Sequence, residues 1–390
     1  MNLVERIDQA PLLLQRWAVG FFPAFLQPWV AMLISAAAII GVFASLFALS
    51  TLAERKGLGR IQNRPGPNRV GPFGMLQPLA DGIKMLIKED IVPLRADKVL
   101  HFLAPIALIV PSLLVYSVLP IGRNLVAMQC QLGVLLFFAI GASTELSIFM
   151  AGWGSHNKYS ILGSIRAIAQ MISYELPMVL AAITVILVTS SLDTVKIVEA
   201  QAGGFWAWHV CTPWGAIALL TFFICALAES NRAPFDLPEA ESELIAGHLT
   251  EYSGFKYALF FMAEYLGMMA ISGMAITLFL GGWQAPLPML DFIPSWLWFF
   301  GKLAGFVVLF IWIRGTLPRL RADQLMNLAW KFLLPIALLN IGLAGLWVKS
   351  SAWIAWPVSI LLLVPAVIGL GRLLRGSRPR GGKRIYQYAD

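Results

Sequence analysis

The sequence predicts an all-α polytopic membrane protein of about nine transmembrane helices, with an amphipathic helix at the cytoplasmic face and ordered cytoplasmic loops. Composition is the first indication, because 58% of the 390 residues are hydrophobic and only 13% are charged. Apolar runs of roughly 20 residues, the length that crosses a bilayer, recur along the chain. These runs must be helical because hydrocarbon offers no water to unpaired backbone groups.

Nine runs are long enough to span a membrane, and we treat residues 1–390 as a single membrane domain. The spans lie at 28–52, 100–121, 131–153, 167–190, 210–229, 257–281, 293–313, 327–348 and 352–371. The first eight make a core from 28 to 348 whose cytoplasmic loops are 53–98, 152–166, 230–256 and 314–327. Residues 349–390 add the ninth span and a basic cytoplasmic tail.

The distribution of basic residues predicts the orientation. Of the 29 Lys and Arg residues, 23 fall in the odd-numbered loops between spans, in the C-terminal tail or, for Lys331, in the first turn of the span that follows such a loop. The positive-inside rule therefore places the N-terminus outside and these loops in the cytoplasm. The same bias explains most of the net charge of +8, so nucleic acid is not a predicted partner.

The first cytoplasmic loop begins with three charged residues, Glu54, Arg55 and Lys56, where the first span leaves the hydrocarbon. Glycines and prolines from Gly57 to Pro72 then predict that the helix does not continue. Such a stiff, irregular segment suits the wall of a cavity, although a plain connector has the same composition.

A further helix is predicted in the same loop, from Phe73 to Asp90. Its polar residues recur at helical spacing and form one stripe on an otherwise apolar cylinder: Gln77, Asp81, Lys84 and Lys88. Its charges prevent it from spanning, so we expect it to lie in the membrane interface. The polar face meets either water, a partner protein or a ligand headgroup.

Spans three to six each carry one acidic residue, and the four are Glu145, Glu175, Glu229 and Glu264. A carboxylate near the bilayer centre costs about 2.5–3.5 kcal/mol on insertion scales. These helices are therefore predicted to share a hydrated polar interior in which the acids form a proton relay. Structural hydrogen bonds between helices are the alternative explanation.

Spans five and six are joined by an acidic insert, residues 229–251, with the sequence ESNRAPFDLPEAESELIAGHLTE. Its acids outnumber the single cation Arg232 and give a formal charge of −5. Clustered carboxyl groups exchange protons when a nearby charge changes. Four of them extend the predicted relay: Asp236, Glu239, Glu241 and Glu243. The D-x-x-E spacing of Asp236 and Glu239 also fits an ordinary helix start.

Three arginines, Arg314, Arg319 and Arg321, follow span seven around a Gly-Thr-Leu-Pro break. Positive-inside anchoring explains most such clusters. A guanidinium beside a helix break also suits a cavity wall, where it binds a carbonyl oxygen or a carboxylate.

Electron carriers have no recognisable site in this sequence. It contains no G-x-G-x-x-G motif, no phosphate-binding loop, no cysteine cluster for iron–sulfur and no metal-ligand spacing among its four histidines. Any redox energy must then come from a partner. Cys130 and Cys211 both fall near outer span ends, where a pairing is open but isolated packing cysteines are favoured.

Four long motifs make the chain resemble a known family. They are AERKGLGRIQNRPGPNRVGPFGMLQPLADGIK, GWGSHNKYSILGSIRAIAQMISYELP, AESNRAPFDLPEAESELIAG with FFMAEY after it, and IRGTLPRLRADQLMNLAWK. The chain resembles a membrane subunit of respiratory complex I, the proton-pumping NADH:quinone oxidoreductase. This protein is the H subunit in bacteria and subunit 1 of NADH dehydrogenase in mitochondria. The match runs from roughly residue 28 to 348, and the motifs are very specific.

The resemblance implies a role for each motif. In the family this subunit joins the hydrophilic arm to the membrane arm, which also contains small and antiporter-like subunits. The cytoplasmic loops of this subunit close the chamber in which quinone is reduced. The residues that would line the chamber or its entrance are Glu54, Arg55, Lys56, Asp81 and Arg314. The path that couples quinone chemistry to pumping would consist of Glu145, Glu175, Glu229 and Glu264, joined to the chamber by Asp236, Glu239, Glu241 and Glu243.

The resemblance also implies cofactors and a location. Quinone is the substrate, while FMN and the iron–sulfur clusters belong to partner subunits and this chain binds none of them. The mitochondrial form has eight spans, so the ninth span here favours a bacterial inner membrane.

Other classes of function fit parts of the pattern. A membrane subunit of an energy-converting hydrogenase shares this ancestry without quinone, and assaying the purified complex for bound quinone separates the two. A free-standing ion-coupled transporter also buries carboxyl groups, but no internal repeat is recognisable. A purely structural anchor gains nothing from four intramembrane acids.

Overall fold

The computed structural model describes residues 3–237, 245–350 and 352–376. Over these residues the regular elements are helices and no strand forms, apart from an isolated bridge between Gly122 and Leu125. Eight helices are long and apolar enough to cross a membrane, and one shorter apolar helix corresponds to the fifth predicted span. The predicted fold class, an all-α polytopic membrane protein, is confirmed.

All nine predicted spans are helical, although some of their ends are shifted. They are α2 (Gln27–Ile61), α4 (Lys98–Leu114, extended by a 3₁₀ turn Val115–Ser117), α5 (Gly133–Gly154), α6 (Lys158–Thr189), α8 (Pro213–Glu229), α10 (Gly254–Phe279), α11 (Ser295–Thr316), α12 and α13 (Ala322–Leu328 and Leu334–Lys349, joined by a π-helical turn) and α14 (Ala352–Gly376). The described helices outside the spans include α1 (Leu3–Val19), α3 (Gln77–Ile87) and α7 (Thr194–Glu199).

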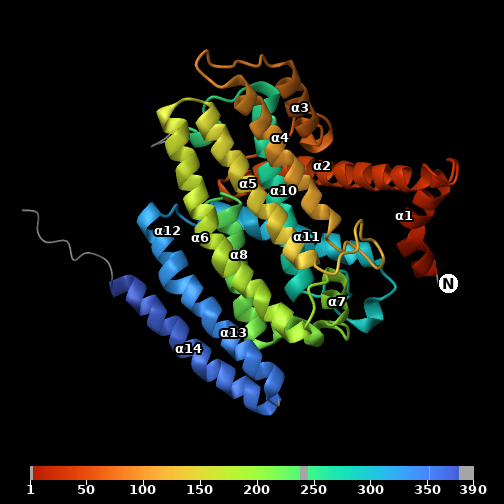
Figure 1. Ribbon diagram of the computed structural model, residues 1–390, viewed down its shortest axis with the longest axis vertical. Coiled ribbons are helices and arrows are strands. Elements are labelled where there is room, and N and C mark those ends of the chain that lie inside the picture. Colours follow the sequence, from red (N-terminus) through yellow and green to blue (C-terminus); the bar gives the residue numbers. More distant parts are fainter. Residues whose placement is uncertain (1–2, 238–244, 351, 377–390) are drawn as a thin grey trace, which may run out of the picture.

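Helix α10 forms the centre of the molecule, where it contacts α2, α4, α6, α8 and α11. In its most apolar stretch of 18 residues, 72% of the residues are buried, the highest share among the eight long spans. In Figure 1, α2 runs across the direction of the other helices and carries α1 at its far end, while α14 lies at the edge against α13. We call the end of the bundle that carries the described loop residues 62–97, 230–237, 245–253 and 317–321 the basic end, because most of the Lys and Arg residues of the loops lie on this side.

The predicted break in the first helix is found, because α2 ends at Ile61, but it comes later than expected, and Gly57 and Gly59 lie inside the helix. These glycines serve close packing. A Cβ at Gly57 would lie 2.9 Å from the Ile311 side chain of α11, and one at Gly59 would lie 2.9 Å from the carbonyl oxygen of Arg64. The helix ends before the prolines, which cannot continue it.

The boundary of the loop 152–166 is also wrong, because α6 begins at Lys158. Asn157 caps this helix by accepting a hydrogen bond from the Tyr159 backbone N–H at 3.0 Å. Further along, a Cβ at Gly163 would lie only 2.5 Å from the Cα of Gly247. The acidic insert therefore packs directly onto the first turns of α6, and only a glycine permits that approach.

Candidate functional site

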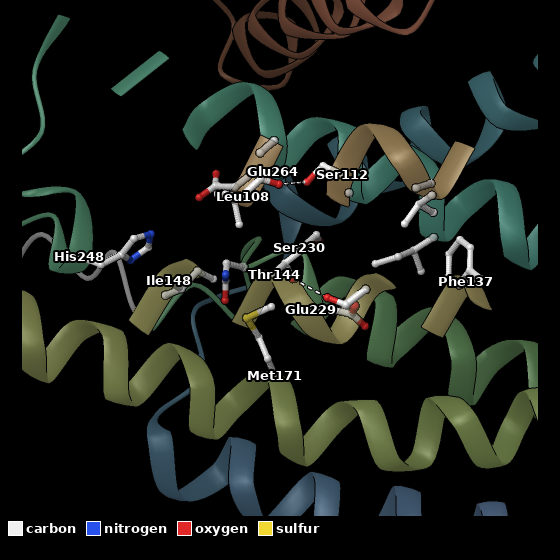
Figure 2. A pocket seen from close by; sticks show the side chains of 17 residues that line it. Leu108, Ser112, Phe137, Thr144, Ile148, Met171, Glu229, Ser230, His248 and Glu264 are labelled. Atoms are coloured by element: carbon white, nitrogen blue, oxygen red, sulfur yellow. Dashed lines mark hydrogen bonds between the residues drawn. The ribbon is translucent and has the colours of Figure 1, made fainter. Parts of the chain in front are cut away.

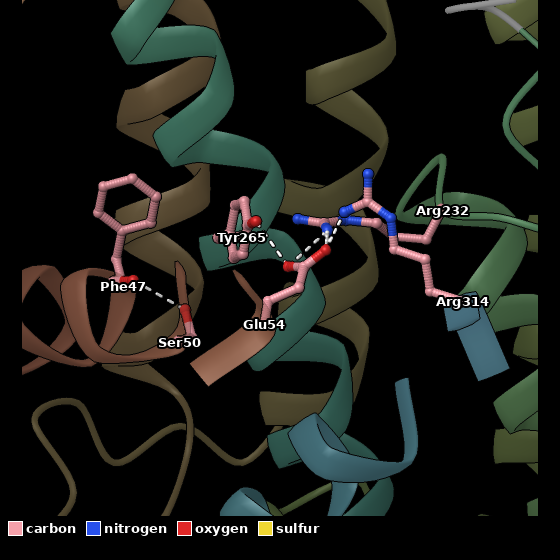
Figure 3. A network of polar contacts seen from close by, with 6 residues as sticks. All are labelled: Phe47, Ser50, Glu54, Arg232, Tyr265 and Arg314. Carbon is pink, nitrogen blue, oxygen red and sulfur yellow. Dashed lines mark hydrogen bonds and ion pairs between the residues drawn. The ribbon is translucent and has the colours of Figure 1, made fainter. Parts of the chain in front are cut away.

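A buried ion-pair cluster joins three helices near the basic end (Figure 3). Glu54 of α2 is at its centre, with a side chain only 6% exposed. Arg232 Nη1 lies 2.8 Å from Glu54 Oε1 and 2.9 Å from Oε2, and the Tyr265 hydroxyl donates to Oε2 at 2.6 Å. Arg314, from the end of α11, also binds Glu54 Oε1. We call these four residues the Glu54 cluster.

The Glu54 cluster carries one more cation than anion. The guanidinium of Arg232 lies 3.9 Å from the centroid of the Tyr265 ring, where its charge faces the π-electrons. Its Nη2 atom is buried and has no hydrogen-bond partner among the described residues. The adjoining cavity has a volume of about 10 Å³, room for about one water molecule. The cluster is thus a preformed positive site with a spare hydrogen-bond donor.

The other predicted chamber residues lie on the neighbouring surface, against α3. Arg55 Nη1 pairs with Asp81 at 2.5 Å, and the Lys84 ammonium lies 3.3 Å from the same carboxylate. Burial raises the pKa of Asp81, but the hydrogen bonds and charges of Arg55 and Lys84 outweigh it, so this pKa lies below its ordinary value. Lys56 donates to the carbonyl oxygen of Phe73. Of the five predicted residues, the structure therefore brings Glu54 and Arg314 together and sets the other three beside them.

Two of the four membrane acids line one internal cavity (Figure 2). Glu229 is the last residue of α8 and Glu264 belongs to α10, and in this view they lie on opposite sides of the space. The cavity has a volume of about 80 Å³, enough for several water molecules, and Ser112 and Thr144 add polar groups to its wall. Glu229 Oε2 is buried without a hydrogen-bond partner among the described residues. We call this space the carboxylate cavity.

The other two membrane acids form a pair. Glu145 of α5 and Glu175 of α6 are half-buried and their carboxyl groups interact with each other. Two carboxylates repel each other, so a proton held by one of them stabilises such a pair. Glu229 lies within electrostatic range of both. Tyr174, next to Glu175, donates its hydroxyl hydrogen to the carbonyl oxygen of Leu325 at 2.8 Å instead. The four acids thus form two adjacent groups, and they do not all line the same cavity.

The acidic insert is described only in part. Asp236 pairs with Arg319 at 2.6 Å, so this arginine binds a carboxylate as the break after span seven indicated. Glu239, Glu241 and Glu243 lie outside the described residues. Glu251 accepts a hydrogen bond from the Asn157 side chain at 2.5 Å. Arg232 does not offset the acids of its own insert, because it is bound to Glu54.

Sequence reasoning missed three functional candidates. Arg232 was noted only as the lone cation of the insert, and Tyr265 only as part of the FFMAEY motif. His248 lines the carboxylate cavity, with 2% of the residue exposed and Nδ1 lacking a partner among the described residues. Among these three residues, only Tyr265 could have been identified from the sequence, because it directly follows the membrane acid Glu264. Cys130 and Cys211 are free thiols, so the open pairing does not form.

The burial of His248 makes a pH dependence of stability testable. Burial lowers the pKa of this imidazole to about 4, whereas an unfolded histidine has a pKa of 6.5. The unfolded state therefore binds a proton first as the pH falls. We expect the contribution of His248 to be complete above pH 6.5 and to be lost progressively down to about pH 4, by on the order of 3 kcal/mol.

The measurement is the melting temperature of the purified protein complex at pH about 7.5 and about 5. His248→Gln is expected to shrink the difference between the two values. His209→Gln, at the opposite end of the bundle, is expected to shrink the difference as well, since burial also lowers the pKa of His209 to about 4. An unaltered pH dependence in His248→Gln would show that the imidazole is not sequestered.

Comparison with known proteins identifies the family. Residues 34–345 match the family model for NADH dehydrogenase. The H subunit of NADH-quinone oxidoreductase from Rubrobacter xylanophilus is 48% identical over 315 residues, 80% of this chain and 94% of the relative. The protein of that name in Dehalococcoides mccartyi strain CBDB1 is 42% identical over 360 residues, 92% of this chain and 98% of the relative.

A third relative, H subunit 2 of the same oxidoreductase in Geobacter sulfurreducens, is 47% identical over 321 residues, which cover 80% of this chain and 94% of the relative. These names are those of subunits of a multi-subunit enzyme, and the predicted resemblance is confirmed. The chain belongs to the NADH dehydrogenase family, as a multi-pass membrane protein of the type that forms the H subunit of NADH-quinone oxidoreductase.

Proposed function

We propose that this subunit forms part of the quinone chamber and couples quinone reduction to proton translocation through its buried carboxyl groups. The observation that carries the proposal is the segment 229–232, which belongs to both sites. Glu229, Ser230 and Asn231 line the carboxylate cavity, and the next residue, Arg232, binds Glu54. A change of charge at the Glu54 cluster therefore acts within one turn of the carboxylate cavity.

The Glu54 cluster suits the place where a quinone gains electrons. Two guanidinium groups against one carboxylate leave a net positive charge that favours negative charge on a nearby oxygen. The Nη2 atom of Arg232 has no partner among the described residues, and an N–H of this kind can donate a hydrogen bond to a quinone carbonyl oxygen. The 10 Å³ cavity beside it is too small for a quinone ring, so we propose that a partner subunit completes the chamber.

The proposed coupling is electrostatic. One quinone takes up two electrons, which a partner subunit delivers, and two protons, and it leaves as quinol. This changes the charge next to the insert, so the proton affinities of Asp236, Glu239, Glu241 and Glu243 change as well. Protons then move along Glu229 and Glu264 and the pair Glu145 and Glu175 toward the other membrane subunits. Neutral carboxyl groups and cavity water serve as donors along this path.

The proposal includes partners and a location. Hydrophilic-arm subunits that hold FMN and the iron–sulfur clusters would cover the basic end, and small and antiporter-like subunits would continue the membrane arm. The ninth span favours a bacterial inner membrane, and the 23 basic residues on one side and in the tail favour an orientation with the N-terminus outside and the C-terminus in the cytoplasm.

The test is to replace Glu239 or Glu243 by glutamine and to measure quinone reduction and proton uptake by inverted membrane vesicles. We expect fewer protons taken up per unit time in both variants, because glutamine does not bind and release protons at neutral pH. Glu199→Gln, an exposed acid at the end of α7, is the matched control at the opposite end. Normal pumping per electron and normal rates in both variants would remove these residues from the relay.

A further inference from the structure

A groove opens at the basic end and is lined by residues that line neither proposed site. It lies between the end of α3, the first turns of α4 and the first turns of α10, and its volume is about 450 Å³. Its apolar wall includes Phe102, Ile106 and Leu259, and its polar rim is made by Lys88, Asp90 and Lys256. A groove with a long apolar wall and a charged rim is suited to bind an amphipathic ligand.

The groove is held in shape by contacts between distant segments. The Ser253 hydroxyl accepts a hydrogen bond from the Ile91 N–H at 2.8 Å and donates one to the Glu89 carbonyl oxygen at 3.3 Å. Gly254 begins α10 with φ +55°, and a Cβ there would lie 3.0 Å from the carbonyl oxygen of Lys88. The end of α3 is thus fixed against the start of α10, and the rim residues are carried on this joint.

The charges on the rim do not cancel. Lys256 Nζ lies 2.8 Å from Asp90 Oδ2, and its side chain is 15% exposed while that of Asp90 is 46% exposed. The same ammonium lies 5.9 Å from the centroid of the Phe102 ring. Lys88 adds a second cation, which leaves the rim with a formal charge of +1. An occupant with one negative charge would balance it.

The apolar wall faces outward at the level where two spans begin. Phe102 is 59% exposed, Leu86 66% and Phe255 50%. These side chains lie within the first turns of α4 and α10 and at the end of α3, where the chain passes from polar loops into hydrocarbon. Basic side chains next to such a boundary attract the headgroups of anionic lipids.

We propose that this groove binds one anionic phospholipid, with the phosphodiester between Lys88 and Lys256 and an acyl chain along Phe102, Ile106 and Leu259. A phospholipid with a single net negative charge satisfies both the rim and the wall. A zwitterionic phospholipid satisfies the wall alone, and so does a neutral isoprenoid quinone. The site therefore discriminates lipids by headgroup charge.

The experiment uses the whole purified complex, stripped of loosely bound lipid, and a photoactivatable phosphatidylglycerol. Cross-linked peptides from residues 98–110 and 254–260 are quantified by mass spectrometry, with a photoactivatable phosphatidylcholine as the second probe. Lys88→Gln is expected to lower the affinity of the anionic probe about fivefold, the equivalent of about 1 kcal/mol per basic residue. Asp90→Asn is expected to raise it, because this carboxylate competes for Lys256.

Lys84→Gln is the matched control, since Lys84 lies in the last turn of α3, just before Lys88, but pairs with Asp81 and does not line the groove. It should leave the labelling unchanged. Equal labelling by the two probes, or labelling that neither Lys88→Gln nor Asp90→Asn alters, would overturn the proposal. If the groove cross-links to another protein of the complex and to no lipid, that protein covers the groove and the proposal is likewise overturned.

Discussion

Replacing Glu54 by leucine is expected to destabilise this subunit by about 3–5 kcal/mol, the cost of breaking a buried ion pair. The Glu54 and Arg232 side chains are only 6% and 9% exposed, so the guanidinium would remain buried without its counter-ion. The Tyr265 hydroxyl would also lose its acceptor. Because a whole domain is stable by only about 5–15 kcal/mol, we expect a large fall in the yield and melting temperature of the assembled complex.

Arg55→Gln is the matched control, one residue further along the same helix. Its ion pair with Asp81 is surface-exposed, with Arg55 49% exposed, so its loss should cost at most about 1 kcal/mol. The double variant Glu54→Leu with Arg232→Met removes the uncompensated buried charge and is expected to regain much of the stability. Quinone reduction should stay low in the double variant. A stable Glu54→Leu single variant with normal quinone reduction would contradict both the energetic and the functional role of the cluster.

The nine spans were predictable because each depends on a local property. Residues 254–279 are apolar enough to require a helix in hydrocarbon whatever surrounds them, and the prediction of 257–281 missed the ends only by the width of a turn. The start of α6 does not follow from a local property of its sequence. Lys158 to Arg166 has the polarity of a loop, and it is helical because Asn157 caps it and Gly163 packs against Gly247.

The candidate site shows the same division. Glu54 and Arg314 were identified as unusual by their position at the end of an apolar run, and they do meet. The partner of Glu54 was not predictable, because Arg232 lies 178 residues away and is brought to it by the crossing of α2, α10 and α11. Charge counting within the insert assigned Arg232 to its sequence neighbours. Only the tertiary arrangement shows that the side chain of this arginine binds Glu54, outside the insert, and so belongs to a separate cluster.

This arrangement gives the insert two ends with different chemistry. Its first residue, Glu229, lines the carboxylate cavity, and its fourth, Arg232, is fixed by Glu54. Gln170 of α6 fixes the chain on both sides of this segment, because its amide donates to the carbonyl oxygens of Ala228 and Phe235 at 2.7 and 2.8 Å. A rigid junction transmits a charge change as an electrostatic effect without needing a large movement.

Glu229→Gln is therefore expected to lower coupled quinone reduction by about 10²-fold, the scale of a lost proton-transfer group. Glutamine has nearly the same volume, so it keeps the packing of α8 while removing the ability to bind and release a proton. The measurement is NADH-driven quinone reduction and proton uptake in inverted vesicles, with electron transfer from NADH to a water-soluble acceptor as the check that the hydrophilic arm is intact.

Two further variants separate proton transfer from structure. Glu229→Asp retains a carboxyl group and should regain a substantial part of the rate, whereas a purely structural role would make the shorter side chain at least as harmful as glutamine. Glu199→Gln, an exposed acid at the far end of the bundle, should behave as the unaltered protein. If Glu229→Gln pumps and reduces quinone at the normal rate, Glu229 cannot carry protons. The segment 229–232 would then join the two sites structurally, with no part in coupling.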